Sequence, residues 1–271
     1  MRAKRDFSGK VVVVTGGAGG LGHAYCERFA AAGSKLGILD LESESLRSVA
    51  KEMSASGVEY VAVSCDVTQQ DQCYSAIEAV NDRFGGVDVL INNAGITQRS
   101  AFSETDIEVF RKVMDVNFFG SLYCAKAALT SLIERKGIII TISSAAGFAP
   151  LYGRTGYAAS KHALHGLFDS LRTELFGTGV DVMIVSPGFT ATGISTSALD
   201  ADGKVTRHPQ SILGRVSTSE EVAEAVFQGA RKGKRLLVLS TMGRVTRIMN
   251  KLFPSLYERL MARSLRSELE R

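Results

Sequence analysis

Short apolar runs rich in β-branched residues alternate with longer stretches of helical periodicity along most of this chain. Seven runs are predicted as strands: residues 11–15, 35–40, 60–65, 87–92, 137–143, 180–186 and 235–239. Several are apolar nearly throughout, as expected for strands that are covered on both faces. Repeated βα units of this length favour a parallel sheet with right-handed crossovers. The pattern predicts an α/β fold, a doubly wound three-layer sandwich with a seven-stranded, mainly parallel sheet.

The domain organisation follows from this count. The intervening stretches are predicted as helices: residues 21–32, 42–56, 70–84, 106–134, 156–176 and 219–232. Seven consecutive strands fit one doubly wound unit, so we expect a single domain over residues 1–243. Residues 244–271 carry apolar residues near helical spacing with basic residues between them, which predicts a basic amphipathic helical extension. Pro254 is expected to divide this extension into two helices.

Charge and cysteine usage limit the classes of partner. The net charge of +4 is too small to argue for nucleic acid, but residues 231–271 hold eleven Lys or Arg and only three Asp or Glu. A solvated helix face, an acidic partner and an anionic membrane surface all remain open for that basic tail. The four cysteines show neither CxxC spacing nor a neighbouring histidine cluster, so we expect no disulfide framework and no metal.

Neither a signal peptide nor a membrane-spanning segment is predicted, because the apolar run after the charged N-terminus is short and meets glycines at once. We expect a cytoplasmic protein. Peripheral association with a membrane through the basic tail is kept as an alternative.

A glycine-rich turn joins the first predicted strand to the first predicted helix. Residues 15–22 read Thr-Gly-Gly-Ala-Gly-Gly-Leu-Gly and fit the patterns GxGxxG and TGxxxGxG equally well. Backbone N–H groups and the helix dipole at such a turn attract a pyrophosphate, as in Rossmann-like nucleotide-binding folds. The predicted cofactor contacts in this turn are Gly16, Ala18, Gly19, Gly20 and Leu21.

Two aspartates follow the next two strands. Asp40 ends the second strand, where a carboxylate accepts hydrogen bonds from ribose hydroxyls and repels a 2′-phosphate. Neither this position nor the next, Leu41, holds a basic residue that could bind a 2′-phosphate, so NAD is predicted in preference to NADP. Asp66, with its neighbour Val67, is predicted to meet the adenine, and the alternative for Asp66 is an N-cap of the following helix.

The candidate catalytic residues begin with Tyr157 and Lys161, which stand four apart on a predicted helix and therefore on one face. A phenol with a pKa near ~10 is a poor base at neutral pH, and a nearby ammonium lowers that pKa. Tyr157 could then exchange a proton with an alcohol or a carbonyl. Ser144, at the end of a strand, could hydrogen-bond the substrate oxygen. The side-chain amide of Asn117 could hold a water molecule beside Lys161 or form hydrogen bonds with nearby backbone groups.

With these residues in place, the chain resembles the short-chain dehydrogenase/reductase family, in its compact single-domain branch, over roughly residues 8–240. The glycine turn looks like the family's cofactor loop, and residues 92–95 look like its NNAG motif. The resemblance places Asn93, Ala94 and Gly95 near the cofactor. It places Pro187, Gly188, Thr190 and Thr192 in the segment that meets the nicotinamide. Its catalytic tetrad falls on Asn117, Ser144, Tyr157 and Lys161.

The resemblance also implies a division of roles. The nicotinamide exchanges a hydride with a carbinol carbon, Ser144 positions the oxygen and Tyr157 moves the proton. Lys161 binds the nicotinamide ribose and lowers the tyrosine pKa, while Asn117 helps to connect the site to a water relay. Such enzymes are dimers or tetramers, so a homodimer or homotetramer is expected, with the helices over 106–134 and 156–176 at one interface.

The residues expected around the substrate are mostly apolar: Ser144, Ala146, Leu151, Tyr152, Tyr157 and Phe189. Arg154 is the one candidate for holding a carboxylate. We therefore expect a lipophilic secondary alcohol or ketone, such as a steroid, a retinoid or another lipid. Residues 190–212 form either a mobile lid or an inert surface loop, and the basic tail either lies on a membrane or covers the pocket entrance.

Two other classes of function remain. One is a catalytically silent NAD-binding regulatory protein, against which the intact tetrad argues. The other is a sugar epimerase or dehydratase, which needs a larger C-terminal substrate domain than the ~40 residues after the last strand can form.

Overall fold

The strands form one parallel sheet in a computed structural model, which describes residues 4–191, 193–208 and 214–266. The strand order is β3-β2-β1-β4-β5-β6-β7, and every neighbouring pair is parallel. The strands are β1 (Val11–Thr15), β2 (Lys35–Asp40), β3 (Tyr60–Ser64), β4 (Val89–Asn92), β5 (Ile138–Ile142), β6 (Asp181–Ser186) and β7 (Leu236–Val238). The predicted fold class is confirmed, and the predicted strand limits are right to within two residues.

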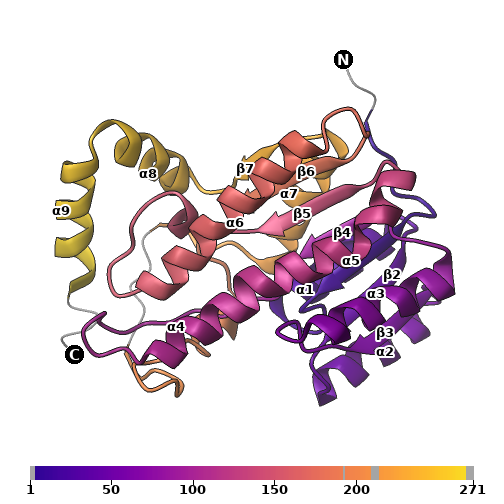
Figure 1. Cartoon of the computed structure of the whole chain (residues 1–271), viewed down its shortest axis with the longest axis horizontal. Helices are drawn as coiled ribbons and strands as arrows, with labels where there is room; N and C mark the ends of the chain where they lie inside the picture. The colour runs from indigo at the N-terminus through magenta and orange to yellow at the C-terminus, as the bar shows by residue number, and fades with distance from the viewer. Residues whose placement is uncertain (1–3, 192, 209–213, 267–271) are drawn as a thin grey trace.

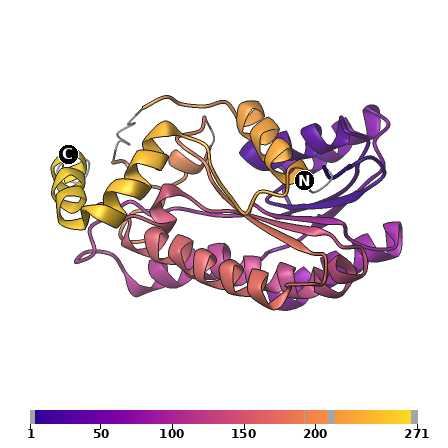
Figure 2. The same cartoon turned by 90° about the horizontal axis from the view of Figure 1, so that it is seen from above.

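Helices cover both faces of the sheet (Figure 2). One face is covered by α1 (Gly20–Ala30), α2 (Glu44–Ala55) and α7 (Ser219–Arg231). The other is covered by α3 (Gln70–Phe84), α5 (Gly120–Glu134) and α6 (Thr155–Glu174). The central strands β1, β4 and β5 are buried over their whole length, which explains why their sequences are continuous apolar runs rather than alternating ones.

The long helix predicted over residues 106–134 is interrupted, which the sequence periodicity did not reveal. It consists of α4 (Ile107–Met114), a π-helical turn η1 (Asp115–Phe119) and α5. Asn117 lies fully buried in that π turn. A π-bulge inside an α-helix is rare and is found mostly at functional sites. The interruption therefore makes this point of the helix a candidate part of a functional site.

The segment Ile107–Glu134 is also the one helical stretch among the described residues that is long and apolar enough, by length and composition, to cross a membrane. Its mean hydropathy is 1.2 over the best window, 44% of which is buried. In this fold α5 packs on β4, β5 and α3, so its apolar face is used inside the sandwich.

The last two helices lie at the end of the molecule opposite to α2 and β3 (Figure 1). These are α8 (Thr241–Leu252) and α9 (Pro254–Leu265), so the predicted break at Pro254 is confirmed. Both leave apolar side chains exposed: Met242, Val245, Ile248, Leu252, Phe253, Leu256 and Leu260. Nδ2 of Asn250 on α8 donates a 3.0 Å hydrogen bond to the carbonyl of Phe148, four residues after Ser144. The C-terminal helices are thereby joined to the loop that follows β5.

Candidate active site

The glycine turn between β1 and α1 has space for a phosphate group. Gly16 and Gly20 have φ angles of +62° and +50°, which side-chain-bearing residues rarely adopt. A Cβ on Gly22 would lie 1.8 Å from the carbonyl oxygen of Gly16, so the helix can approach the turn only with glycine there. Gly19, the N-cap of α1, faces open space, with nothing within 4 Å of where a Cβ would be. The residues present therefore fit a dinucleotide pyrophosphate at this helix N-terminus.

Asp40 is bonded to the same turn. Its Oδ2 accepts a 2.8 Å hydrogen bond from the backbone N–H of Ala18, and its Oδ1 accepts one of 2.8 Å from Leu41. The carboxylate is thus held at the end of β2, beside the glycine turn, by two backbone donors. Each oxygen keeps a further acceptor position, which a ribose hydroxyl can use.

The NNAG segment is joined to the cofactor turn from the other side. Nδ2 of Asn93 donates to the carbonyls of Thr15 and Gly16, both at 3.0 Å. The backbone N–H groups of Asn93 and Ala94 donate to Oγ1 of Thr15, again at 3.0 Å. A Cβ on Gly95 would lie 3.5 Å from Nζ of Lys161, so the backbone here runs directly beside the candidate catalytic amine.

Asp66 does not cap the following helix, so that alternative is wrong. The N-cap of α3 is Gln69, and Oδ1 of Asp66 instead accepts hydrogen bonds from the backbone N–H (2.9 Å) and Oγ1 (2.8 Å) of Thr68. This closes a turn of the kind that aspartate favours two residues before its partner. Val67 is buried against Gly120 at the start of α5.

The buried amide of Asn117 bonds to backbone and to a hydroxyl. Its Oδ1 accepts a 2.8 Å hydrogen bond from the N–H of Ile96, and its Nδ2 donates to the carbonyl of Ile96 (3.0 Å) and to Oγ of Ser160 (2.8 Å). Oγ of Ser160 then donates to the carbonyl of Tyr157 at 2.8 Å. Sequence reasoning missed Ser160. The only signal for it was its place between Tyr157 and Lys161, one residue before the lysine.

Lys161 and Tyr157 lie close together on α6, as their spacing predicts. Nζ of Lys161 is 5.6 Å from the centre of the Tyr157 ring and donates a 2.9 Å hydrogen bond to the carbonyl of Ile142 at the end of β5. Burial lowers the pKa of Lys161 to about 8. A fraction of this amine is therefore neutral slightly above physiological pH.

The pKa of Tyr157 departs from the sequence expectation. Burial raises it above its ordinary value, while a hydrogen bond with Ser144 and the positive charge of Arg154 act in the lowering direction. The expected depression of this pKa by Lys161 is not among the effects found, and burial outweighs the favourable contacts with Ser144 and Arg154. The expectation left out the cost of removing the phenol from water.

Ser144 lies where β5 ends and the short 3-10 turn η2 (Ala145–Gly147) begins. Its Oγ caps that turn by accepting a 3.2 Å hydrogen bond from the N–H of Ala146. The preceding Ser143 is buried, and its Oγ donates to the carbonyl of Lys161 at 3.4 Å. Of these two serines, Ser144 is therefore the one bonded to Tyr157.

The segment after β6 holds the residues expected at the nicotinamide. Gly188 packs against Ser240, which a Cβ on Gly188 would approach to 2.8 Å. Oγ1 of Thr190 donates to the carbonyl of Gly188 at 3.3 Å, and Pro187 is half-buried. Thr192 lies outside the described residues.

The residues expected around the substrate differ in exposure. Ala146 is buried, Leu151 and Phe189 are half-buried, and Tyr152 is 37% exposed. Arg154 is buried and donates a 3.0 Å hydrogen bond to the carbonyl of Tyr152. Its guanidinium therefore supports the turn before α6. A cavity of about 350 Å³ is lined by residues 200, 202 and 204–208 of the loop expected as a lid.

Known proteins resemble this chain in sequence over most of its length. A family model described as short chain dehydrogenase matches residues 10–203. Dehydrogenase/reductase SDR family member 7B of Mus musculus is 35% identical over 274 residues, which cover 99% of this chain and 85% of the mouse protein. Dehydrogenase/reductase SDR family protein 7-like of Drosophila melanogaster is 32% identical over 266 residues, covering 96% of this chain and 82% of the fly protein.

Solved structures are similar over the whole fold. A short-chain dehydrogenase/reductase from Burkholderia phymatum in complex with NAD aligns with a TM-score of 0.84 at 25% identity, covering 93% of this chain and 96% of the bacterial one. A short-chain dehydrogenase from Streptomyces avermitilis aligns with a TM-score of 0.78 at 28% identity, covering 96% and 97%. The chain therefore belongs to the short-chain dehydrogenase/reductase family, whose members are nicotinamide-dependent oxidoreductases acting on CH–OH groups.

Proposed function

We propose that the chain interconverts a secondary alcohol and a ketone, with Tyr157 as the group that exchanges the proton. The observation that supports this most is the meeting of Tyr157 with Ser144 and Lys161 at the ends of α6 and β5. The bound nicotinamide supplies the hydride acceptor or donor. Ser144 holds the substrate oxygen beside the phenol, and the ammonium of Lys161 favours the phenolate electrostatically.

Asn117 acts in this proposal as a positioning residue. Both N–H groups of its amide are used by Ile96 and Ser160, its oxygen accepts from Ile96, and Ser160 holds the carbonyl of Tyr157. It therefore fixes where the first turn of α6 lies relative to η1. Because none of the four expected residues is replaced, nothing in the described residues favours a silent regulatory protein.

NAD is proposed as the preferred cofactor. The Asp40 carboxylate is held beside the glycine turn by Ala18 and Leu41, where an adenosine ribose would lie in a Rossmann-like fold. A 2′-phosphate at that place would meet a fixed negative charge. Asp66 and Val67 are proposed to line the adenine pocket on the adjacent strand.

A lipophilic substrate is proposed because the residues expected around it are mostly apolar. Ala146, Leu151 and Phe189 are apolar, and the nearby Arg154 is bonded to backbone within its own turn. The test is an absorbance screen at the nicotinamide wavelength with steroids, retinol, long-chain alcohols and polyols, each with NAD and with NADP. Activity confined to polyols would contradict the lipophilic assignment, and a preference for NADP would contradict the role of Asp40.

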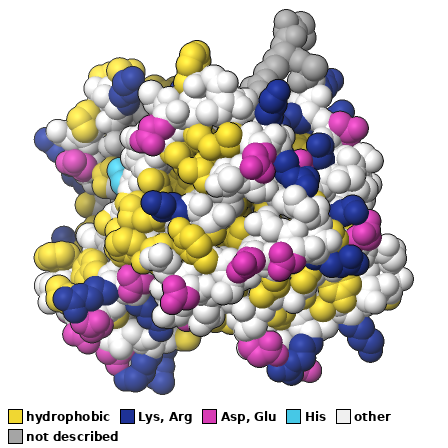
Figure 3. Space-filling model, turned by 45° about the vertical axis from the view of Figure 1, so that its right-hand side comes forward, with side chains coloured by type: hydrophobic (Ala, Val, Ile, Leu, Met, Phe, Trp, Pro, Cys, Tyr) yellow, Lys and Arg dark blue, Asp and Glu magenta, His cyan; other side chains and the backbone are white. Residues whose placement is uncertain are grey.

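Self-association is proposed through the face formed by α5 and α6. The side of the molecule drawn in Figure 3 carries apolar patches between charged side chains. Phe119, at the end of η1, and Ile133, on α5, are each more than one-third exposed. Sedimentation analysis should give a dimer or tetramer, and replacement of both side chains by Ser should shift the distribution toward the monomer.

We propose that α8 and α9 form an extension to the dehydrogenase domain and contact an anionic membrane surface. Basic residues lie among their exposed apolar side chains, including Arg244 and Lys251 on α8 and Arg259 on α9. Vesicles that contain an anionic lipid should sediment the whole chain but not a chain ending at residue 243. Equal sedimentation of both would contradict the membrane contact.

A further inference from the structure

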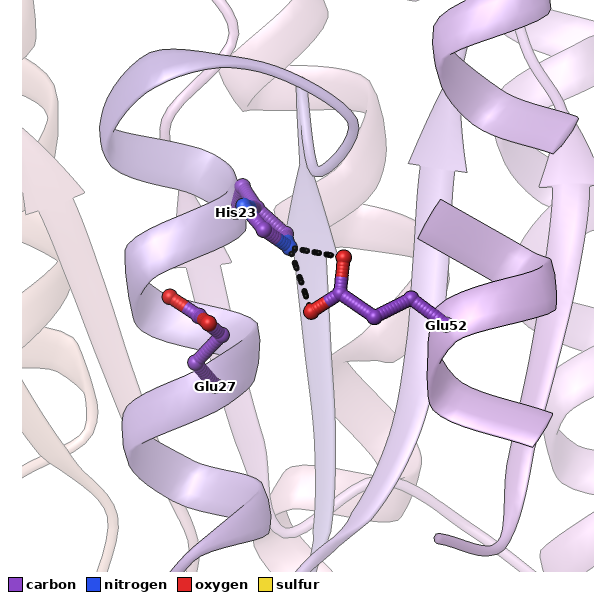
Figure 4. Close-up of side chains that lie close together, drawn as sticks. All are labelled: His23, Glu27 and Glu52. Carbon is purple, nitrogen blue, oxygen red and sulfur yellow. Dashed lines mark hydrogen bonds and ion pairs between the residues drawn. The ribbon is translucent and has the colours of Figure 1, made fainter. Parts of the chain in front are cut away.

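Three side chains of types that can bind a metal ion, two from α1 and one from α2, lie close together between these helices (Figure 4). His23 and Glu27 stand four residues apart on α1, so they lie on one face of that helix. Glu52 faces them from α2, and its Oε1 and Oε2 lie 3.3 Å and 3.1 Å from Nε2 of His23. One ligand atom from each of the three residues lies within 4.8 Å of the other two.

These separations are close to those that a tetrahedral metal ion requires. Zinc binds His nitrogen at ~2.0–2.1 Å and carboxylate oxygen at ~2.0–2.2 Å, which places neighbouring donor atoms roughly 3.3 Å apart. The His23–Glu52 pair already has that separation. Glu27 is exposed, so its side chain can change rotamer and adjust the position of its carboxylate at little cost.

An ordinary surface ion pair explains only part of this arrangement. A His–Glu pair at the surface contributes little to stability, and it does not account for Glu27. The carboxylate of Glu27 pairs with no cation among the described residues. The neighbouring Arg28 is directed instead toward Glu224 of α7. Two carboxylates and one imidazole in this space leave an excess of negative charge that a divalent cation would neutralise.

We propose that His23, Glu27 and Glu52 bind a divalent cation of the zinc class. The imidazole favours such borderline ions over Mg²⁺ and Ca²⁺, which prefer sites made wholly of oxygen atoms. Water completes the coordination, because the site is open to solvent. No metal was expected from the spacing of the cysteines and histidines. Glu52 is 29 residues from His23, so this cluster exists only once α1 and α2 pack together.

A cation at this position would affect the elements proposed to bind the cofactor. Helix α1 begins at Gly20 in the glycine turn, and α2 begins four residues after Asp40. A cation coordinated by both helices would cross-link the two helices that follow the pyrophosphate turn and the carboxylate proposed to bind the ribose. It would therefore restrict their relative motion without touching the reacting atoms.

The test is zinc binding by the full chain, measured by titration calorimetry after metal has been removed with a chelator. We expect one Zn²⁺ per chain. His23→Gln and Glu52→Gln should each weaken binding at least about tenfold, because even residues that only support a ligand cost that much. Glu27→Gln should weaken it to a smaller degree. The matched controls His162→Gln on α6 and Glu78→Gln on α3, both exposed, should bind as the unchanged chain does.

Cobalt distinguishes this site from the buried cysteines. Co²⁺ bound by His23 and two glutamates should give weak visible bands without the intense near-ultraviolet band of a thiolate–cobalt bond. Circular dichroism confirms that each variant is folded. The proposal is overturned by the absence of stoichiometric Zn²⁺ binding, by binding that survives His23→Gln and Glu52→Gln, by a thiolate band, or by equal competition from Mg²⁺. None of these readouts depends on turnover.

Discussion

Nδ2 of Asn117 donates a 2.8 Å hydrogen bond to Oγ of Ser160, and this single contact connects the π turn η1 to the first turns of α6. Both groups are fully buried. The contact matters because Ser160 in turn holds the carbonyl of Tyr157. The backbone that carries the candidate proton-transfer group is therefore fixed by a neighbouring helix as well as by its own.

Replacement of Ser160 by Ala should destabilise the protein. It leaves one N–H of the buried Asn117 amide without an acceptor, which costs about 1–3 kcal/mol. Ser170→Ala, at an exposed position of the same helix, should change the free energy of unfolding by less than about 0.5 kcal/mol. Urea denaturation measures both. Equal stability of the two variants would show that the Asn117–Ser160 contact does not hold η1 to α6.

Replacement of Tyr157 by Phe should abolish proton exchange and leave cofactor binding intact. Removal of a general acid–base typically costs a factor of about 10²–10⁴ in rate. The measurement is kcat for an alcohol identified in the screen, together with NADH affinity from fluorescence titration. Tyr74→Phe, at a 41% exposed tyrosine of α3, is the matched control and should retain most of kcat. Retained turnover in Tyr157→Phe would remove that residue from the mechanism.

Lys161 should make stability depend on pH in a defined window. Its folded pKa of about 8 lies below the ordinary value of 10.5, so the folded chain binds fewer protons than the unfolded chain between these values. The contribution of Lys161 to the free energy of unfolding therefore increases as pH rises through the window. Between pH 8 and 9.5 the unchanged chain should gain about 1.5 kcal/mol relative to Lys161→Met.

The control for this effect is Lys126→Met, at an exposed position of α5, which should show no such gain. Thermal or urea unfolding at several pH values gives the differences. A constant difference between the unchanged chain and Lys161→Met from pH 7 to 9.5 would contradict the lowered pKa.

Two substitutions at Asp40 separate its charge from its hydrogen bonds. Asp40→Asn keeps an oxygen to accept the N–H of Ala18 but removes the negative charge. It should raise the ratio of NADP to NAD affinity at least about tenfold, because juxtaposed like charges cost several kcal/mol. Asp40→Ala removes both functions and should also weaken NAD binding. An unchanged ratio in Asp40→Asn would place the ribose elsewhere.

The strands and their parallel direction could be predicted because the central strands β1, β4 and β5 are buried on both faces, and their continuous apolar runs show this locally. The order of the strands in the sheet was not predicted, because it depends on which distant segments pair. The break at Pro254 was equally local, since proline cannot continue a helix. The π turn around Asn117 was not predictable from periodicity, because one inserted residue hardly changes an apolar pattern. The spacing of Tyr157 and Lys161 was informative because both lie on one helix.

The packing of the folded chain explains most of the remaining differences. The alternative of an N-cap for Asp66 is wrong because the helix starts further on, at Gln70, and the aspartate bonds to Thr68. The raised pKa of Tyr157 results from the burial of the phenol by the folded chain, which the local sequence does not contain. Ser160 gains its role only when η1 packs on α6.

The bond between Asp40 and the amide of Ala18 has a consequence for anyone who would redesign this enzyme. The carboxylate proposed to select the cofactor is also a support of the loop that receives the pyrophosphate. A variant intended to accept a 2′-phosphate therefore needs two changes, a basic group for the phosphate and a new acceptor for that amide. Without the second change, a gain in tolerance is accompanied by a looser binding loop for both cofactors.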